Sequence, residues 1–579
     1  MQKRITIDGM LDLHIANKDV LATYDNHEVH FTYIGLSNDR VSERYLLFSL
    51  DYHIEPQAIL YGDGFQMHSQ VCGRLEDLRD IGLGQDNSST YRLYPRSEAK
   101  RFYNHVIVSD SLGYTLFGFT SCHRFSGYFQ FSEMKGIHKL SAYLDGENTY
   151  PQDWTSSQLE SVLVLQSANL QDLYAQYADR LAVQHPPRRP NSSAAPIGWS
   201  GHHAYDMAVN DRQLQANLNA LPILSNAVEY VLIDEGYQAA IGDWLTPSEL
   251  GGIDVKQQIK QIRAAGKKPA IWLAPFIAQQ QSELFKHYPD WFVKNEADRP
   301  LKAEEITHAG WHSTPWYILD MTNPDVQEHI GEVVRYMRVE WGIELFKLDA
   351  CYWGAIKAQR SQTGLTGVEA YRMGRQAITD AADSAIVMAN HAPLWPSLGM
   401  VDVMGIGADV VRDERRFEQH AKEVLLRSWQ HRRLWQVDPD SLVLISLPNQ
   451  GTERKYYDFH RTVHLACAGV LMLGDPLDEM TAFAKQSIDK LIIRLQHNQE
   501  AVRFSTLNLQ HGSLALTANN DLHCLFNYQQ PAREVTLAAD HPVDWHDFWT
   551  GEKLNQQPIQ AFEITLESGL SARAILTVG

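Results

Sequence analysis

The sequence predicts a multidomain fold of the mixed α/β plus β class, with a central (β/α)8 TIM barrel flanked in the chain by two β-domains. Three observations support this: short alternating strands fill the first third, apolar strands alternate with amphipathic helices in the middle, and short strands return at the end. We expect an N-terminal β-sandwich domain at 1–185, a linker at 186–196, the barrel at 197–502 and a small antiparallel β-domain at 503–579.

The N-terminal third consists of apolar runs with period-two alternation, such as EVHFTYIGL and RYLLFSLDYHI, separated by Asn, Asp, Gly and Ser. This pattern is typical of antiparallel strands. A helical pattern at 170–184 ends this part, and the segment PPRRPNSSAAP follows it. Because that segment is dense in Pro, Ser and Ala and has no apolar periodicity, it indicates a linker.

The middle of the chain contains eight short apolar runs with helical patterns in most of the gaps. The predicted helices include 253–266, 324–341, 366–382 and 416–430. Eight buried strands that are mostly followed by helices favour a barrel, with a doubly wound sheet as the alternative. The predicted strands are 197–200, 230–237, 268–275, 345–353, 385–392, 401–409, 434–438 and 468–476.

Composition and charge exclude several classes of protein. The 51 basic and 70 acidic residues give a net charge of -19, which argues against nucleic acid or an anionic membrane as partner. No run of 18 apolar residues occurs, so we expect no membrane span. Five scattered cysteines without a CxxC pair, and an N-terminus without an apolar signal region, predict a cytoplasmic protein. The sequence carries no feature that sets the oligomeric state.

Polar residues follow the predicted strands at the ends where barrel enzymes place their chemistry. They are Asp234, Glu235, Lys347, Asp349, Asn390, His391, Asp409, Asp438, Asp440 and Asp475, with several Trp and Tyr residues nearby. Paired carboxylates beside aromatic rings are what cleavage of a glycosidic bond requires. Alternation places Lys347 and Asp349 on one strand face, where the ammonium would keep the carboxylate ionised. The alternative for any single Asp is that it only caps the next helix.

Two adjacent histidines, His202 and His203, together with His391, raise the question of a metal site. Adjacent side chains on a strand point apart, and neither HExxH nor a cysteine-rich spacing is present, so we expect pocket hydrogen-bonding groups and no metal. The segment GIGADV lacks the third glycine of a dinucleotide fingerprint, and no GxxxxGK loop exists. We therefore expect no cofactor.

An ordered series of motifs across roughly 197–480 resembles the α-galactosidases of glycoside hydrolase family 36, in clan D. The series is LIDEGY, GDW, AIWLAPF, LDMTNP, FKLDACYW, PLWPSLG, IGAD and RRLWQVDPD. The N-terminal GFQMHS (64–69) resembles the loop that this family extends over its active site from a β-supersandwich domain. The resemblance implies a retaining exo-α-glycosidase that removes terminal α-galactosyl-type residues from oligosaccharides or other glycosides.

The resemblance also implies roles for individual residues. Asp349 matches the family's nucleophile and Asp409 its general acid/base, which implies double displacement with the two carboxyl groups about 5–5.5 Å apart. Lys347 matches a sugar-binding lysine, Asp234 the first of two carboxylates at the C4 and C6 end of the sugar, and Trp272 an aromatic wall. Asp413 is the competing acid, but we expect it to begin the next helix.

Several pocket positions depart from the family pattern, and we expect them to contact substrate. The second carboxylate is Glu235 instead of Asp, Phe65 replaces a Trp, and Gly405 stands where an Arg beside the sugar's C2 is usual. The other altered positions follow strands one and five: His202, His203, Asn390 and His391. Trp199 of strand one matches the family's Trp, and we expect it to contact substrate as well. Loss of the Arg would admit a larger C2 substituent. The alternatives are therefore an α-N-acetylgalactosaminidase, an α-transglycosylase, or a catalytically idle carbohydrate-binding protein.

Overall fold

The computed structural model describes residues 3–9, 11–35, 40–134, 136–154, 156–190, 193–207, 209–248, 253–312 and 314–579. Asn191 and Ser192 of the predicted linker and Leu36 of the apolar run EVHFTYIGL lie outside this part. The chain forms two compact units, each assembled from separate segments. Unit 1 comprises Met1–Arg189, Gln238–Ser248 and Trp272–Asp402; unit 2 comprises Pro190–Tyr237, Glu249–Ile271 and Val403–Gly579. The predicted domain boundaries stay a prediction.

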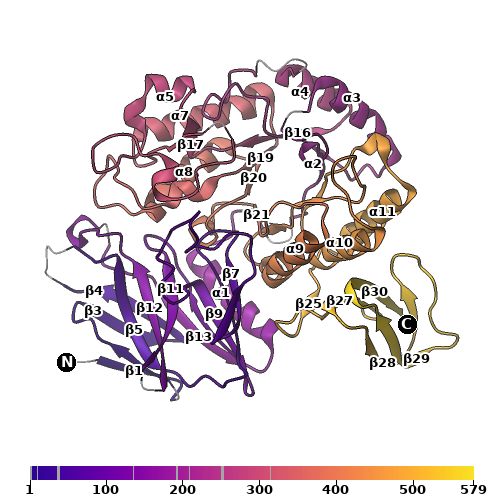
Figure 1. Cartoon of the computed structure of the whole chain (residues 1–579), viewed down its shortest axis with the longest axis horizontal. Coiled ribbons are helices and arrows are strands. Elements are labelled where there is room, and N and C mark those ends of the chain that lie inside the picture. The colour runs from indigo at the N-terminus through magenta and orange to yellow at the C-terminus, as the bar shows by residue number, and fades with distance from the viewer. Residues whose placement is uncertain are drawn as a thin grey trace. The chain divides into compact units, whose positions relative to one another are not determined.

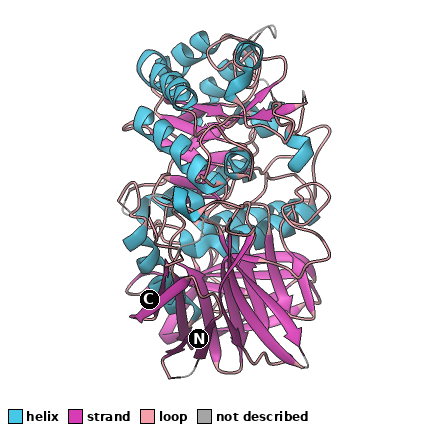
Figure 2. Cartoon of the chain, turned by 90° about the vertical axis from the view of Figure 1, so that its left-hand side faces the viewer, coloured by secondary structure: helices cyan, strands magenta, loops and turns pink. Residues whose placement is uncertain are grey.

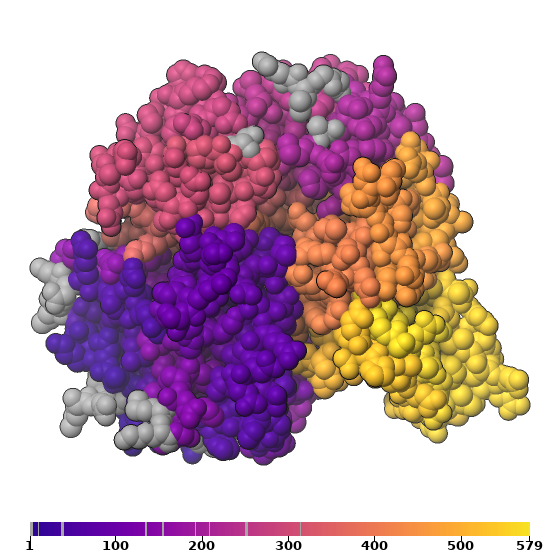
Figure 3. Space-filling model, in the orientation of Figure 1, coloured from indigo at the N-terminus to yellow at the C-terminus, as the bar shows by residue number. Residues whose placement is uncertain are grey.

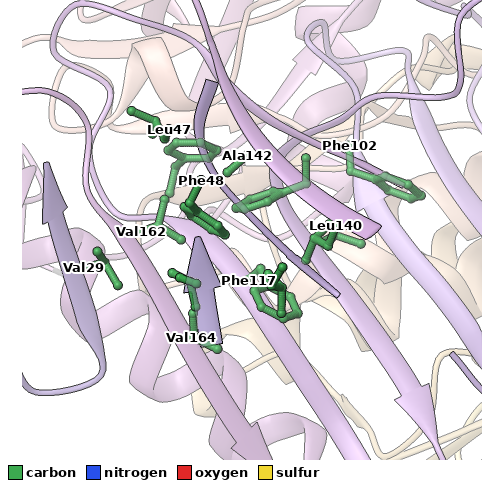
Figure 4. Packing of buried hydrophobic residues seen from close by; sticks show 14 of the residues in the cluster. Val29, Leu47, Phe48, Phe102, Phe117, Leu140, Ala142, Val162 and Val164 are labelled. Atoms are coloured by element: carbon green, nitrogen blue, oxygen red, sulfur yellow. The ribbon is translucent and has the colours of Figure 1, made fainter. Parts of the chain in front are cut away.

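The N-terminal part of unit 1 is a 13-stranded antiparallel sheet, in the order β1-β2-β5-β12-β11-β9-β10-β13-β4-β3 with β6, β7 and β8 branching from β9 (Figures 1 and 2). Its inward side chains form a large apolar core that includes Phe48, Phe117 and Leu140 (Figure 4). The strands are β1 Lys3–Ile7, β2 Leu11–Ile15, β3 Val20–Asp25, β4 Glu28–Tyr33, β5 Arg44–Asp51, β6 Ile59–Asp63, β7 Gln70–Arg74, β8 Asp77–Asp80, β9 Phe102–Asp110, β10 Gly113–Phe119, β11 Gly127–Met134, β12 Ile137–Asp145 and β13 Val162–Ser167.

Helix α1 (Leu170–Gln184) packs on β10 and β13, as the sequence predicts for 170–184. It begins at Asn169, whose side chain accepts from the backbone of Gln171 and so satisfies a free N–H of the first turn. Its buried face includes Tyr177, whose hydroxyl donates to the Phe119 carbonyl at 2.8 Å. A Cβ at Gly118 would lie 2.5 Å from the Tyr177 ring, so this close helix–strand contact requires glycine.

The eight predicted barrel strands all form and join in one parallel sheet. The strand order is β22-β21-β20-β19-β16-β15-β14-β24-β23. Successive barrel strands pair with each other, and the first strand, β14, pairs with the last, β24, which is the order of a TIM barrel and not of a doubly wound sheet. The two ends of the order, β22 and β23, are halves of the seventh strand, interrupted at Pro439 and Asp440. The strands are β14 Ile197–Ser200, β15 Tyr230–Ile233, β16 Lys268–Leu273, β19 Leu345–Leu348, β20 Ile386–Ala389, β21 Val403–Gly405, β22 Gln436–Asp438, β23 Ser441–Leu442 and β24 Leu471–Leu473.

The helices between these strands include all four predicted ones. In α8, Thr366 and Glu369 form a reciprocal capping box that explains why the helix begins at Gly367. A two-stranded sheet of β17 (Ile277–Gln279) and β18 (Trp316–Ile318), which the sequence analysis did not predict, follows the third barrel strand. The helices are α2 His202–Tyr205, α3 Asp211–Ala220, α4 Val255–Ala264, α5 Glu283–His287, α6 Ala303–Ile306, α7 Pro324–Tyr336, α8 Gly367–Ala382, α9 Glu414–Arg427, α10 Arg454–Cys467 and α11 Ala482–His497.

The C-terminal part of unit 2 is the antiparallel sheet that the sequence predicts. Its six strands run in the order β25-β26-β27-β30-β28-β29, and β30 contacts α10 (yellow against orange in Figure 3). A small apolar core around Trp545, Leu525 and Ile575 holds it together. The strands are β25 Arg503–Phe504, β26 His511–Thr517, β27 Asn520–Gln530, β28 Arg533–Asp547, β29 Ile559–Leu566 and β30 Gly569–Val578.

Within unit 1, Glu147 of the N-terminal part binds the first turn of α8. Its carboxyl oxygens accept from the Gly367 N–H at 2.9 and 3.1 Å, which supplies an acceptor for an N–H left free by the helix. Burial raises the pKa of Glu147 from the ordinary 4.5 to about 7. The carboxyl therefore ionises at a cost to the folded state.

We expect Glu147→Gln to change stability in a pH-dependent way. Since the folded-state pKa is raised, protonation of Glu147 favours the folded state fully below about pH 4.5, and this contribution is lost as the pH rises through about 7. The variant should match the parent at pH 4 and exceed it at pH 8, by at most about 3 kcal/mol. Thermal unfolding at both pH values measures this. Glu76→Gln, at an exposed site, is the control; equal effects of Glu147→Gln at both pH values would contradict the expectation.

Candidate active site

In unit 1, Asp349 follows β19 and is held by hydrogen bonds to both carboxyl oxygens. Trp272 Nε1 donates to Oδ2 at 3.1 Å, and the Ala350 N–H donates to Oδ1 at 2.7 Å. The Asp349 N–H in turn donates to the Leu273 carbonyl at 2.7 Å, which ties the end of β19 to the end of β16. These bonds fix the plane of the carboxylate and favour its charged form.

The local sequence explains how Asp349 is presented. Lys347 and Asp349 are half-buried and Leu348 between them is buried, in agreement with the predicted alternation. Ala350 then adopts a left-handed conformation with φ of 52°, so the chain turns sharply directly after the carboxylate. The Trp272 ring packs edge-on against Trp244 at 5.9 Å and forms a buried aromatic wall beside Asp349.

A second cluster in unit 1 surrounds His391, which follows β20. The His391 ring stacks on His68 at 4.4 Å and on Tyr352 at 4.8 Å, and its Nε2 lies 3.4 Å from the Tyr91 hydroxyl. Burial, with the neighbouring histidines His68 and His308, holds the pKa of His391 well below its usual range, so the ring is neutral.

Asn390 is the other altered position after strand five. Its N–H donates to the Leu348 carbonyl at 2.7 Å, so it leaves the sheet beside Asp349. The side chain is 7% exposed, and its Oδ1 accepts no hydrogen bond within the described residues. Such an atom is a ready acceptor for a ligand hydroxyl.

Phe65 is placed by Asp86, a residue that the sequence analysis did not identify. The Phe65 N–H donates to Asp86 Oδ2 at 2.7 Å, and its ring packs edge-on against Tyr103 at 5.5 Å. Burial raises the pKa of Asp86 to about 6. The Phe65 ring, in the loop 64–69, therefore packs on Tyr103 of β9. The sequence did not predict this contact.

In unit 2, the ends of β14 and β15 bring Trp199, Ser200, Asp234 and Glu235 together. Asp234 accepts from the Ser200 hydroxyl at 3.3 Å and from the Glu235 N–H at 3.0 Å. Trp199 Nε1 donates to the Asp475 carbonyl at 2.9 Å. All four residues are buried, so the first two barrel strands supply a compact polar group at one edge.

His202 and His203 lie in the short helix α2 and not on a strand, which corrects the expectation that their side chains diverge by strand geometry. Their rings are 5.2 Å apart and nearly perpendicular. His203 Nε2 lies 3.2 Å from Asp440 Oδ2, so His203 binds a strand-seven carboxylate.

The Asp409 side chain is exposed, but the backbone on both sides of it is fixed by buried carboxylates. The Ala408 N–H donates to Glu423 Oε2 at 2.7 Å, and the Val410 N–H donates to Asp440 Oδ2 at 2.6 Å. Glu423 lies on α9, and nothing in the sequence distinguishes it from a glutamate exposed to solvent. The competing Asp413 begins α9 and accepts from the Arg415 N–H at 3.0 Å, as expected.

Asp475 has a structural role in unit 2. Arg412 Nη2 binds its Oδ1 at 2.7 Å and the Leu444 N–H donates to its Oδ2 at 2.5 Å, while Arg412 also donates to the carbonyls of His203 and Ile445. Asp475 is 3% exposed. Asp475 therefore stabilises the fold through an ion pair and a backbone hydrogen bond, and not as the helix cap that was the alternative for a single Asp.

The candidate residues thus fall into two groups. Unit 1 holds Phe65, Trp272, Lys347, Asp349, Asn390 and His391, and unit 2 holds Trp199, His202, His203, Asp234, Glu235 and Asp409. Among the described residues, no cluster of three or more His, Cys, Asp or Glu side chains is arranged to hold a metal ion. Nor does any helix in the described ranges combine the length and apolar character needed to cross a membrane.

One segment of the chain, which includes the first barrel strands, matches a known protein family. Residues 190–381 match the family model described as Melibiase. The resemblance to α-galactosidases is therefore confirmed, and the Melibiase segment contains Asp234, Glu235, Trp272, Lys347 and Asp349, whereas Asn390, His391 and Asp409 follow it.

Known proteins support the same relationship. The bifunctional α-galactosidase/sucrose kinase AgaSK of Mediterraneibacter gnavus is 25% identical over 133 residues, which are 22% of this chain and 13% of that protein. The structure of the α-galactosidase TtGalA from Thermus thermophilus, in complex with p-nitrophenyl α-D-galactopyranoside, is 18% identical with a TM-score of 0.68, covering 88% of this chain and 97% of that one. The family 36 α-galactosidase AgaA from Geobacillus stearothermophilus is 13% identical with a TM-score of 0.60, covering 98% and 81%. The structures establish a common fold, while the sequence match spans only a small part of AgaSK.

We expect Arg412→Met to destabilise the protein strongly, by about 3–5 kcal/mol, because it leaves the Asp475 carboxylate buried without its cation. Unfolding in urea measures the loss. Arg415→Met, at an exposed position of α9, should change stability by less than about 0.5 kcal/mol.

The double variant Arg412→Met/Asp475→Asn tests the cause. It should recover part of the lost stability, because the uncompensated charge is gone. A double variant less stable than Arg412→Met would contradict the ion-pair explanation.

Proposed function

We propose that this protein is a retaining exo-α-glycosidase that hydrolyses terminal α-galactosyl residues of oligosaccharides. The observation that carries the proposal is the carboxylate of Asp349, fixed by Trp272 and Ala350 at the end of β19, within the Melibiase segment. A nucleophile for an anomeric carbon must be ionised, oriented and reachable, and Asp349 is hydrogen-bonded through both oxygens and half-buried.

In the proposed double displacement, Asp349 attacks the anomeric carbon while Asp409 donates a proton to the leaving oxygen. Water then attacks the glycosyl-enzyme, Asp409 removes its proton, and the sugar leaves with its original configuration. The exposed side chain of Asp409 suits a group that exchanges protons with leaving groups and water. The rigid backbone around it, held by Glu423 and Asp440, limits the positions that this side chain reaches.

The remaining candidate residues would bind the sugar through hydrogen bonds and ring contacts. Asp234 and Glu235 offer acceptors for hydroxyl groups, and the neutral His391 with Asn390 offers further hydrogen-bonding groups. The Trp272 indole presents an apolar face beside the nucleophile. A neutral polyhydroxylated ring matches this set of groups.

We further propose a cytoplasmic location. The five cysteines are free thiols, and Cys122, Cys351, Cys467 and Cys524 are buried. Free thiols throughout a chain of this length favour a reducing compartment.

Asp349→Asn should abolish the function almost completely. We expect kcat on p-nitrophenyl α-galactoside to fall by about 10³-fold or more, because the amide cannot act as a nucleophile. Asp380→Asn on the exposed surface of α8 is the matched control and should retain parent activity. Wild-type-like turnover by Asp349→Asn would overturn the assignment of the nucleophile, whereas a parent protein that binds galactose without hydrolysing the galactoside would be a carbohydrate-binding protein.

The stereochemistry and the sugar can be read from the same parent enzyme. Proton NMR of the reaction should show the α-anomer of galactose first; β-galactose would indicate inversion. Faster hydrolysis of the nitrophenyl α-N-acetylgalactosaminide than of the α-galactoside would instead identify the C2 substituent as the selected group.

Asp409→Ala should affect substrates according to their leaving groups. We expect a large loss of kcat/KM on oligosaccharides, whose leaving oxygen needs a proton. The loss on nitrophenyl glycosides should be smaller, because nitrophenolate leaves without protonation. Steady-state kinetics on both substrate types measures the ratio. Equal losses on the two types would contradict the acid role of Asp409.

A further inference from the structure

A histidine that the sequence analysis did not identify, His420, lies on the buried face of α9, one turn before Glu423, and is 3% exposed. Its Nε2 lies 2.5 Å from the Pro439 carbonyl oxygen, which can only accept, so Nε2 carries the proton and donates. Burial lowers the pKa of His420 from its usual value, although Glu423 and Asp440 oppose this shift. The ring is therefore neutral, and Nδ1, which has no hydrogen-bond partner among the described residues, is unprotonated.

The Pro439 carbonyl belongs to the turn that interrupts the seventh barrel strand in unit 2. Asp440 has a left-handed backbone conformation there, with φ of 66°, which residues other than glycine keep only where neighbouring contacts fix it. Both polar groups of the Pro439–Asp440 peptide are bonded: His420 binds the C=O, and the N–H donates to Asp438 Oδ1 at 3.0 Å. The orientation of this peptide sets where the Asp440 carboxylate lies.

The His420 ring also lies beside the stretch of chain that leads to Asp409. A Cβ at Gly407 would lie 3.5 Å from His420 Cδ2 and 3.3 Å from Glu423 Oε2, so the backbone before Asp409 passes directly against this face of α9. His420 therefore joins the helix that carries Glu423 to the turn that carries Asp440. These are the two carboxylates that bind N–H groups on either side of Asp409.

We propose that His420 is a positioning residue for the acid/base step, because it fixes the spacing of the two carboxylates that hold the backbone around Asp409. The inference rests on the proposed function, in which Asp409 protonates the leaving oxygen. Without the hydrogen bond from His420, the Asp440 carboxylate and the Val410 N–H that it binds shift together, and the Asp409 carboxyl loses its alignment. A displacement of about 1 Å in such a group costs up to about 100-fold in rate.

The kinetic test removes the hydrogen bond and then restores it. In His420→Leu, we expect the ratio of kcat/KM on stachyose to kcat/KM on p-nitrophenyl α-galactoside to fall at least about tenfold, because only the sugar leaving group needs a proton. His420→Gln, whose amide N–H reaches the same carbonyl, should bring the ratio to within about threefold of the parent.

The matched control is His464→Leu, the same substitution at a buried histidine of the neighbouring helix α10 (Figure 1). The His464 Nε2 has no hydrogen-bond partner within the described part of the chain, so this variant should leave the ratio unchanged. Equal losses on both substrates in His420→Leu, or the same fall in His464→Leu, would overturn the proposal, since a general loss of stability affects both substrates alike.

A second pair of variants gives the test if His420→Leu does not fold. The amide of His420→Asn is one methylene shorter than that of His420→Gln and does not reach the Pro439 carbonyl, so its ratio should fall as in His420→Leu. Equal ratios in His420→Asn and His420→Gln would overturn the proposal.

Amide exchange separates this inference from the proposed function. The Val410 N–H should exchange with deuterium at least about tenfold faster in His420→Leu than in the parent or in His464→Leu, as measured by mass spectrometry of peptides that cover 405–412. If exchange responds in this way but the parent hydrolyses no α-galactoside, the proposed function fails and the support of the Asp409 backbone by His420 stands. If the parent hydrolyses α-galactosides but the exchange or the kinetic ratio is unchanged in His420→Leu, the function stands and the role of His420 is wrong.

Discussion

The register of the parallel strands around β19 is the constraint on which the unit 1 cluster depends. Lys347 pairs with Met388 and Leu348 with Ala389, and the next backbone bonds run from Asn390 to Leu348 and from Asp349 to Leu273. A shift of one residue would turn Asp349 and Lys347 to the opposite face and bring Leu348 to theirs. The hydrogen bond from Trp272 to Asp349 depends on this register, because the register places the two side chains side by side at the same end of their strands.

Neutrality of the buried His391 imidazole is the second condition for this arrangement. His391 is buried and packs against His68 and Tyr352. The ring centroids of the two histidines are 4.4 Å apart, so two charged imidazoles would repel each other strongly. Burial lowers the pKa of His391 and so removes this repulsion. A wall of neutral rings can donate and accept hydrogen bonds without attracting ions, which fits a sugar better than a charged substrate.

Much of the fold and part of the candidate site could be predicted from the sequence, since periodicity reports burial directly. The eight barrel strands, helix α1 and the role of Asp413 as a helix cap follow from local patterns. Glu423 and Asp440 were not predicted as supports of Asp409, because their partners are backbone N–H groups distant in the chain. The contact of Phe65 with Tyr103, likewise, depends on how the loop 64–69 folds against Asp86. Local patterns do not specify such long-range hydrogen bonds.

Asp349 and Asp475 show why position alone does not identify a reactive carboxylate. Both follow barrel strands, and the sequence treats them alike. Asp475 is enclosed by the Arg412 guanidinium and the Leu444 N–H at 3% exposure, so reaction at its oxygens would break a buried ion pair. Asp349 accepts hydrogen bonds from the Trp272 indole N–H and the Ala350 backbone N–H, and it is only half-buried. Exposure and the nature of the donors, more than strand position, therefore distinguish a carboxylate that can attack substrate from one that stabilises the fold.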